Sequence, residues 1–211
     1  MSKTKVLNLY AGIGGNRKLW ENVDVTAVEI DSTTAEVYQD HFPADTVVVA
    51  DAHKFLLDHY KEYDFIWSSP PCPTHSRTQI MSVFDESRPE NQSRSAVYPD
   101  MKLYQEIILL QRFGDCDWVV ENVVPYYDTL IDAQKIGRHL FWSNYHIDGS
   151  VTSDVRVHDD VAELQSAYGF DLSGYDLDDK RKRIRNCVDP RLGKHVFESR
   201  TTQDTLPGVE L

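Results

Sequence analysis

The regular alternation of short apolar runs with more polar segments constrains the fold more than any other feature of this sequence. We expect buried strands at residues 5–9, 25–30, 46–50 and 64–68. Helical segments are expected near 16–21, over 31–41 with Asp31 as N-cap, and near 54–60. Strands and helices that alternate at this interval are typical of βαβ units. The first third of the chain therefore predicts an α/β fold built on a parallel sheet.

The rest of the chain is less regular. A helix is expected over residues 101–113, strands over 118–120 and 140–147, and a short helix over 192–198. Residues 73–99 are polar without clear periodicity, and a loop of that length in a compact domain is usually functional or disordered. Residues 148–179 are acidic and weakly patterned, and the last eleven residues, 201–211, are typical of a tail.

The distribution of charge is uneven. The 211 residues fit one domain, or one with a small appendage, and their net charge of −12 opposes non-specific binding to nucleic acid. Residues 148–179 hold nine acids and one base, whereas residues 180–194 hold seven bases and one acid. The basic segment fits a nucleic-acid contact or a solvated helix face equally well. No apolar run of about 18 residues and no signal peptide are visible, so we expect a cytoplasmic protein without membrane contact.

The cysteines and histidines show no metal-ligand spacing. Three cysteines fit no zinc pattern, and a lone cysteine is most often a small buried hydrophobe, which is our expectation for Cys116 and Cys187. We expect packing or surface roles for four histidines, namely His53, His59, His139 and His146. No metal site is predicted.

Three successive strands of the predicted sheet end in residues suited to a nucleotide. The glycine-rich turn 11–15 follows the first strand and opens the expected helix, so its backbone can approach a ligand closely where a helix N-terminus favours negative charge. Glu29 ends the second strand, where a carboxylate can accept from both ribose hydroxyls, and Asp51 ends the third. These features predict an adenosine-type site, which fits a dinucleotide and S-adenosylmethionine equally well.

A cysteine and a carboxylate follow the next two strands. Cys72 lies beside the predicted site, where a nucleophile would lie, although a structural cysteine fits as well. Glu121 follows three apolar residues, so we expect partial burial to favour its protonated form. A thiolate and a protonatable carboxylate in one crevice suit attack on an electron-poor ring.

Six short motifs, in matching order and spacing, resemble those of the cytosine-C5 DNA methyltransferases. They are 8–15 (NLYAGIGG) for the first cofactor motif, 28–42 (VEIDSTTAEVYQDHF) for the ribose-binding segment, 70–76 (PPCPTHS) for P-C-Q-x-x-S, 121–123 for E-N-V, 134–138 (QKIGR) for Q-x-R-x-R, and 185–192 (RNCVDPRL) for G-N-A-V-P-P-x-L. The resemblance covers about residues 5–146 and 184–197. It implies a Rossmann-like class I S-adenosylmethionine-dependent methyltransferase fold, a mostly parallel sheet with helices on both faces.

The resemblance also implies a mechanism. Cys72 attacks C6 of cytosine as a thiolate, Glu121 contacts N3 and the exocyclic amine, and Arg138 holds the base or orients Glu121. C5 then takes the methyl group of S-adenosylmethionine, and the cytosine is flipped out of its duplex or already single-stranded. The implied cofactor-binding residues are Tyr10, Ala11, Gly12, Gly14, Gly15, Glu29, Ile30, Asp51, Ala52, Pro71, Leu103, Asn186 and Cys187. The implied substrate-binding residues are Ser76, Arg77, Asn122 and Val123.

Several features depart from the family pattern. Pro73 replaces a Gln, Ile136 replaces the middle Arg, and Arg185 replaces the Gly before Asn186. The usual target-recognition domain is reduced to an acidic insert. We therefore divide the chain into a catalytic and cofactor-binding domain (1–146), the insert (147–183), a segment that returns to the catalytic domain (184–200) and a tail (201–211). Because base readout needs several side chains in a groove, we expect low or very short sequence specificity, or a protein partner that supplies it.

The sequence thus predicts a DNA (cytosine-5)-methyltransferase of prokaryotic or phage type that acts through a covalent Cys72 intermediate. The same chemistry on RNA or on a free cytosine nucleotide is an alternative, which the acidic charge and the reduced insert favour more than they would in a typical family member. An amino-group methyltransferase fits less well, because Cys72 stands where the S-P-P-Y motif has an aromatic residue. A non-catalytic cofactor-binding subunit is a fourth reading, against which the intact pair of Cys72 and Glu121 argues.

Overall fold

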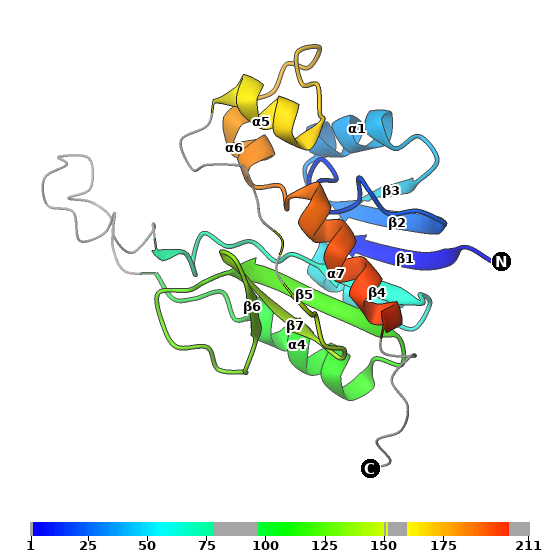
Figure 1. Ribbon diagram of the computed structural model, residues 1–211, viewed down its shortest axis with the longest axis vertical. Helices are drawn as coiled ribbons and strands as arrows, with labels where there is room; N and C mark the ends of the chain where they lie inside the picture. The colour runs from blue at the N-terminus through cyan, green and yellow to red at the C-terminus, as the bar shows by residue number, and fades with distance from the viewer. Residues whose placement is uncertain (1, 78–96, 150, 152–159, 203–211) are drawn as a thin grey trace, which may run out of the picture.

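The computed structural model describes residues 2–77, 97–149, 151 and 160–202, and within them seven strands form one sheet in the order β3-β2-β1-β4-β5-β7-β6 (Figure 1). The strands are β1 (Thr4–Leu9), β2 (Val23–Glu29), β3 (Thr46–Val49), β4 (Phe65–Ser68), β5 (Asp117–Val123), β6 (Gln134–Ile136) and β7 (His139–Ser143). The helices are α1 (Ser32–His41), α2 (Ala52–His59), α4 (Lys102–Phe113), α5 (Val161–Tyr168), α6 (Lys180–Arg185) and α7 (Pro190–Thr202).

The sheet is mostly parallel, as predicted. Strands β1 to β5 pair in parallel, while β7 runs antiparallel to both β5 and β6. The chain moves outward from β1 to β3 and then crosses back to place β4 on the other side of β1. In open α/β sheets, ligands bind beyond the carboxyl ends of the strands at such a switch point. The expected Rossmann-like α/β fold is confirmed, and it directs attention to the edge where β1 and β4 end.

Helices cover both faces of the sheet because strand side chains alternate between two apolar clusters. Val6, Phe65 and Val119 face one side and pack with Val196 and Phe197 of α7. The next residues along β1, β4 and β5 face the other side, where they pack against α2 and α4. Figure 1 shows α7 across the front of the sheet and α4 behind it.

Helices α5 and α6 pack onto the glycine-rich turn and α1. Leu164 of α5 and Ile184 of α6 share a buried cluster with Ile13 of the glycine-rich turn and Val37 of α1. Helices α5 and α6 lie next to each other on the α1 side of the sheet (Figure 1). The insert therefore forms one wall beside the turn.

The helix expected near residues 16–21 is wrong, because the chain makes successive turns there. Contacts of individual side chains with distant parts of the chain hold this segment in place. The Arg17 guanidinium pairs with Asp45 at 2.8 Å, and the buried Trp20 donates its Nε1–H to the Gly193 carbonyl at 3.0 Å. The glycine-rich turn consequently does not open a helix, and the predicted attraction of negative charge by a helix N-terminus does not apply.

Other differences concern the second half of the chain. Strand β6 and helix α5 lie in segments where we expected neither, and β7 ends at Ser143, before the expected strand end. Helix α7 is longer than expected and takes in residues 201 and 202 of the expected tail. Residues 78–96 of the expected loop, 150 and 152–159 of the insert and 203–211 of the tail lie outside the described residues. None of the described helices has the length and apolar character needed to cross a membrane.

Candidate functional site

Glu29 ties the glycine-rich turn to the end of β2. Its Oε2 accepts the Gly12 N–H at 3.0 Å, and its Oε1 accepts the Asp31 N–H at 3.0 Å. A carboxylate oxygen has two lone pairs, so both oxygens keep capacity for ribose hydroxyls. Glu29 therefore fixes the shape of the turn, and its carboxylate oxygens remain available there as hydrogen-bond acceptors for a ligand.

The glycines of the turn differ in what surrounds them. Gly12 has a φ of +56°, and a Cβ there would have no atom within 4 Å, so the space above it is open to a ligand. A Cβ on Gly14 would meet the Phe42 ring, and a Cβ on Gly15 would lie 2.6 Å from both the Cys187 Cβ and the Val188 carbonyl oxygen. Cys187 and Val188 of the returning segment thus pack directly against the turn. Among the three glycines of the turn, only Gly12 has open space beside it.

The neighbouring cofactor candidates fall into exposed and buried groups. Ile30 is 69% exposed immediately after Glu29, so its apolar side chain is accessible to a ligand ring. Asp51 caps α2, where its Oδ1 accepts from the His53 N–H at 3.0 Å and the Lys54 N–H at 3.2 Å. The hydrogen bond from Lys54 is the main reason why the pKa of Asp51 lies below its ordinary value.

Four predicted cofactor contacts have side chains in the protein interior. Ala52 and Leu103 belong to the cluster between the sheet and helices α2 and α4, so these side chains support the site from beneath. Cys187 is buried against the turn, and burial raises the pKa of its thiol to about 12. Ala11 is also buried, whereas Pro71 and Asn186 are exposed.

A buried carboxylate that the sequence analysis missed lies under the end of β1. Glu106 of α4 accepts from the Tyr10 hydroxyl at 2.6 Å and the Ser68 hydroxyl at 2.6 Å, and it contacts His53 Nδ1 at 2.8 Å. Tyr10, predicted as a cofactor contact, therefore directs its hydroxyl into the protein. A charged residue among the buried positions of α4 was the available sequence signal.

Cys72 lies just past the carboxyl end of β4 and is partly buried. Burial, followed by the negative charge of Glu121, raises the pKa of its thiol, and the positive charge of Arg185 acts in the opposite direction. Charged groups from two other segments of the chain, Glu121 in β5 and Arg185 in α6, therefore act on the Cys72 thiol. Arg185, which replaces the family's Gly, is thus near enough to Cys72 for its charge to act on the thiol.

The segment that carries Cys72 is fastened to the end of β5. Asn122 is buried and donates its Nδ2–H to the Pro70 carbonyl at 3.0 Å, while its Oδ1 accepts the Val123 N–H at 2.9 Å. The Asn122 side chain, predicted to bind substrate, is therefore engaged in holding the loop. The partly buried Val123 ends β5.

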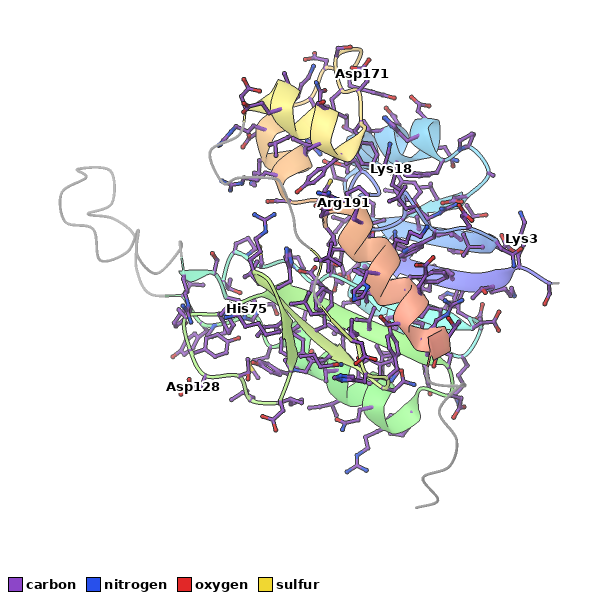
Figure 2. The ribbon with its side chains drawn as sticks, viewed as in Figure 1. Lys3, Lys18, His75, Asp128, Asp171 and Arg191 are labelled. Carbon is purple, nitrogen blue, oxygen red and sulfur yellow. The ribbon has the colours of Figure 1, made fainter. Side chains whose placement is uncertain are left out.

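The residues after Cys72 pair with the chain beyond β5. Ser76 forms an isolated antiparallel β-bridge with Pro125, and Arg77 donates its Nε–H to the Pro125 carbonyl at 3.0 Å. The buried His75 contacts the Tyr127 hydroxyl through Nδ1 at 2.5 Å. Figure 2 shows His75 at the end of the sheet opposite Lys3, which precedes β1. These contacts place the predicted substrate-binding pair Ser76 and Arg77 at the carboxyl edge.

Glu121 contacts a histidine that the sequence analysis assigned to packing. His139 Nδ1 lies 2.6 Å from Glu121 Oε1, and both side chains are buried. Arg138 donates its Nε–H to His139 Nε2 at 3.2 Å. The structure therefore connects Arg138 to Glu121 through His139. The available signal was that His139 directly follows the last arginine of the Q-x-R-x-R-like segment.

Tyr168 brings the insert close to this chain of contacts. Its side chain is buried, and its hydroxyl has no hydrogen bond of normal geometry within the described residues. Burial raises the pKa of Tyr168 to about 12, and the adjacent Arg138 guanidinium opposes this shift. Arg138 is thus flanked by His139 and by the insert.

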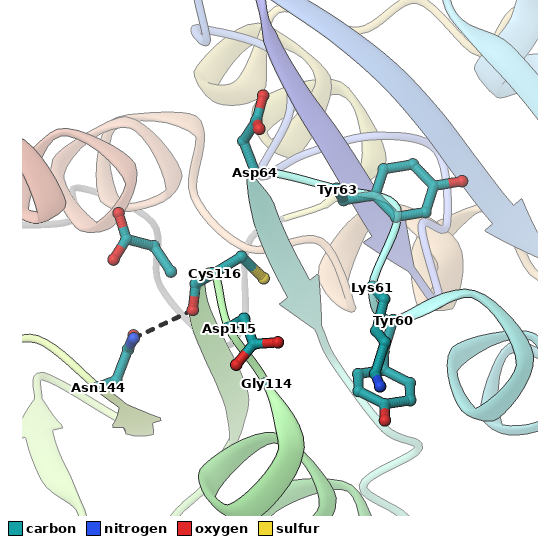
Figure 3. A pocket seen from close by; sticks show the side chains of 9 residues that line it. Tyr60, Lys61, Tyr63, Asp64, Gly114, Asp115, Cys116 and Asn144 are labelled. Atoms are coloured by element: carbon teal, nitrogen blue, oxygen red, sulfur yellow. Dashed lines mark hydrogen bonds between the residues drawn. The ribbon is translucent and has the colours of Figure 1, made fainter.

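A hollow of about 540 Å³ lies at the opposite edge of the sheet. Figure 3 shows it between the segments that precede β4 and β5, where Asn144 donates to the Cys116 carbonyl at 3.1 Å. It is lined by Tyr60, Lys61, Tyr63, Asp64, Gly114, Asp115, Cys116, Asp117 and Asn144. None of the predicted site residues lines it, so size alone does not identify the functional edge of this sheet.

Residues 4–91 match the family model for C-5 cytosine-specific DNA methylases. This range includes the glycine-rich turn, Glu29, Asp51 and Cys72, and it ends before Glu121. The resemblance read from the sequence is therefore confirmed for this part of the chain. Comparison with curated proteins finds no match.

Solved structures share the fold. The methyltransferase EhMeth of Entamoeba histolytica aligns with a TM-score of 0.57 at 12% identity, over 98% of this chain and 100% of that chain. A DNMT2 variant of Spodoptera frugiperda aligns with a TM-score of 0.37 at 23% identity, over 57% of this chain and 36% of that one. A SAM-dependent methyltransferase of Agrobacterium tumefaciens aligns with a TM-score of 0.39 at 16% identity, over 59% and 40%. The likeness to EhMeth confirms a methyltransferase-type fold.

Proposed function

We propose that this protein transfers a methyl group from S-adenosylmethionine to C5 of cytosine in DNA, through a covalent bond to Cys72. The observation that carries the proposal is that β4, which Cys72 follows, pairs in parallel with β5, which contains Glu121 near its carboxyl end. Both residues therefore lie toward the same edge of the sheet, and the negative charge of Glu121 acts on the thiol. The family match over residues 4–91 and the shared fold support the broader assignment to the S-adenosylmethionine-dependent methyltransferases.

The residues at the end of β1 and β2 fit the cofactor. Gly12 leaves open space above the turn, Glu29 offers carboxylate oxygens, and Ile30 presents an exposed apolar surface to an adenine ring. When bound, S-adenosylmethionine supplies an electrophilic methyl group. The turn and Cys72 both follow the carboxyl ends of neighbouring parallel strands, so the turn would hold this group on the side of the nucleophile.

The chain's own residues activate the cytosine. The Cys72 thiolate adds to C6 and forms an S–C6 bond, which transfers electron density to C5. Glu121 donates a proton to N3 as this density develops and takes it back afterwards. C5 then forms its bond to the methyl group, whose bond to the cofactor sulfur breaks and leaves S-adenosylhomocysteine. A base removes the C5 proton, and the C6–S bond breaks to return the thiolate. C6 is unreachable within a duplex, so the base enters flipped or from a single strand.

A basic helix beside the nucleophile favours a polynucleotide over a free nucleotide. Helix α6 has the sequence KRKRIR, and its last residue, Arg185, exerts its charge on Cys72. In a protein with a net charge of −12, this local reversal of sign supports contacts with backbone phosphates. We propose short or low sequence specificity, or a partner protein that supplies it. RNA remains the second candidate substrate, because phosphate contacts serve both polymers.

The test is methyl transfer from labelled S-adenosylmethionine to duplex DNA, single-stranded DNA, tRNA and dCMP in parallel, with Cys72→Ala as control. Label in DNA recovered as 5-methylcytosine, and lost in Cys72→Ala, is the expected result. Label in DNA that persists in Cys72→Ala would contradict the covalent route, and label confined to tRNA or dCMP would contradict the proposed substrate. Cofactor binding without transfer to any of the four would favour a non-catalytic subunit.

A further inference from the structure

We propose that His139 is a positioning residue that holds the Glu121 carboxylate for reaction and relays to it the charge of Arg138. This inference rests on the proposed function, because it assigns a role within that same site. It begins from the contact of 2.6 Å between His139 Nδ1 and Glu121 Oε1. Both side chains are buried, so the contact is shielded from water.

The sheet itself brings these two residues together. Strand β7 runs antiparallel to β5, with Phe141 opposite Glu121 and His139 opposite Val123. Residues two apart on a strand face the same side, so His139 and Glu121 are diagonal neighbours on one face of the sheet. The contact is therefore set by strand register rather than by a flexible loop.

The hydrogen bonds fix the tautomer of the imidazole. Arg138 approaches His139 Nε2 with an N–H group at 3.2 Å, and a guanidinium has only donors. Nε2 must therefore be the acceptor, so the proton of the neutral ring is on Nδ1, where it is donated to Glu121.

This arrangement orients the carboxyl group for its proposed task. The bond to Oε1 removes the freedom of Glu121 to rotate and leaves Oε2 as the oxygen that can meet the base. The positive charge of Arg138 reaches the carboxylate through the polarised ring. A reacting group that is oriented by a second residue, itself oriented by a third, is a general device of catalytic sites.

Two substitutions separate this role from simple packing. His139→Phe keeps a ring of similar volume and removes the donor, whereas His139→Asn is smaller and places an amide N–H near the position of Nδ1. We expect His139→Phe to lower kcat roughly 10- to 100-fold, as for loss of a hydrogen bond to a charged group, and His139→Asn to restore kcat to within about fivefold of wild type. KM for the nucleic acid should change little in either variant. His146→Phe is the matched control, because its side chain is 68% exposed.

Opposite behaviour of the two variants would overturn the proposal. If His139 only fills space, His139→Phe keeps its activity and the smaller Asn loses it. The same conclusion follows if both variants keep wild-type kcat.

A second measurement does not depend on methyl transfer. Ring ¹⁵N chemical shifts of His139 in the wild type should report a neutral imidazole protonated at Nδ1, and the Nδ1–H resonance should move in Glu121→Gln. A ring protonated at Nε2 would overturn the inference even in an active enzyme. If no substrate is methylated but the Nδ1–H resonance behaves as described, the proposed function fails and the contact between His139 and Glu121 still stands.

Discussion

At the scale of single residues, the thiol of Cys72 is under opposing influences. Burial and Glu121 raise its pKa, and Arg185 lowers it. The raised pKa means that the thiolate is a smaller fraction at neutral pH than in an ordinary cysteine, so its reactivity should rise as the pH increases through neutrality. The positive charge of Arg185 favours the thiolate and so offsets part of the rise in the pKa of Cys72.

We expect alkylation of Cys72 by iodoacetamide to rise with pH and to be roughly two- to fivefold slower at neutral pH in Arg185→Gln, because a nearby positive charge that favours the thiolate is lost. Peptide-resolved mass spectrometry separates Cys72 from Cys116 and Cys187. Lys182→Gln, in the same helix, removes an equal charge as the control. Faster alkylation in Arg185→Gln would contradict the role given to this residue.

The strand-end residues of the candidate site were predictable from sequence, and their partners were not. Cys72 and Glu121 each follow an apolar run, so the placement of both at one edge follows from a parallel sheet. His139 contacts Glu121 only because β7 pairs with β5 in one register, and Glu106 meets Tyr10 only because α4 packs beneath β1. Such contacts depend on which strands and helices become neighbours in the fold. Local sequence patterns do not contain that information.

At the scale of elements, apolar character decided which ones the sequence predicts. Runs of three to six residues rich in apolar side chains indicated the strands of the parallel sheet. Strand β6 has three residues, and only Ile136 among them is apolar, so no such run marked it. Helix α5 begins with a capping box in which Asp160 and Glu163 bond to each other's backbone, so a local signal for it was present within the acidic segment.

Helices α2 and α4 are joined by His53 and Glu106, and this link should respond to pH. The hydrogen bond to Glu106 raises the pKa of His53 above its ordinary value. A raised pKa in the folded state contributes stability that is complete below the unfolded value, about 6.5, and is lost as the pH rises through the folded value. We expect the wild type to be more stable than His53→Gln. The difference between their free energies of unfolding should be about 1 kcal/mol larger at pH 5.5 than at pH 8.5.

Urea unfolding at the two pH values measures this difference. His59→Gln is the control, because His59 and Glu62 form an exposed pair on α2 and the following turn, where such contacts contribute little. An equal effect of His53→Gln at pH 5.5 and pH 8.5 would show that the link does not titrate as described.

At the scale of the whole molecule, distant parts of the chain complete one site. Gly15 near the start touches Cys187 and Val188, and Gly193 of α7 packs against the backbone of Asn16. Tyr168 brings the insert beside Arg138. The glycine-rich turn, the insert and the returning segment are therefore mutually dependent, although 1–146, 147–183 and 184–200 are distinct in sequence character.

Gly15→Ala should destabilise the protein by about 1–3 kcal/mol, because the added methyl group meets backbone and Cβ atoms that have no room to withdraw. Gly174→Ala is the control, since a Cβ at Gly174 has no neighbour within 4 Å. Urea unfolding followed by tryptophan fluorescence measures both, because Trp20 and Trp67 lie in the core. Equal stability of Gly15→Ala and wild type would contradict the close approach of the returning segment.

The contact between Gly15 and Cys187 also sets an order of events during protein synthesis. The glycine-rich turn is synthesised early, but Cys187 and Val188, which pack against Gly15, are synthesised more than 170 residues later. Until then the turn has the hydrogen bond between Gly12 and Glu29 but lacks the packing of Cys187 and Val188 against Gly15. The last wall of the turn is therefore completed late, after the strands of the sheet have been synthesised.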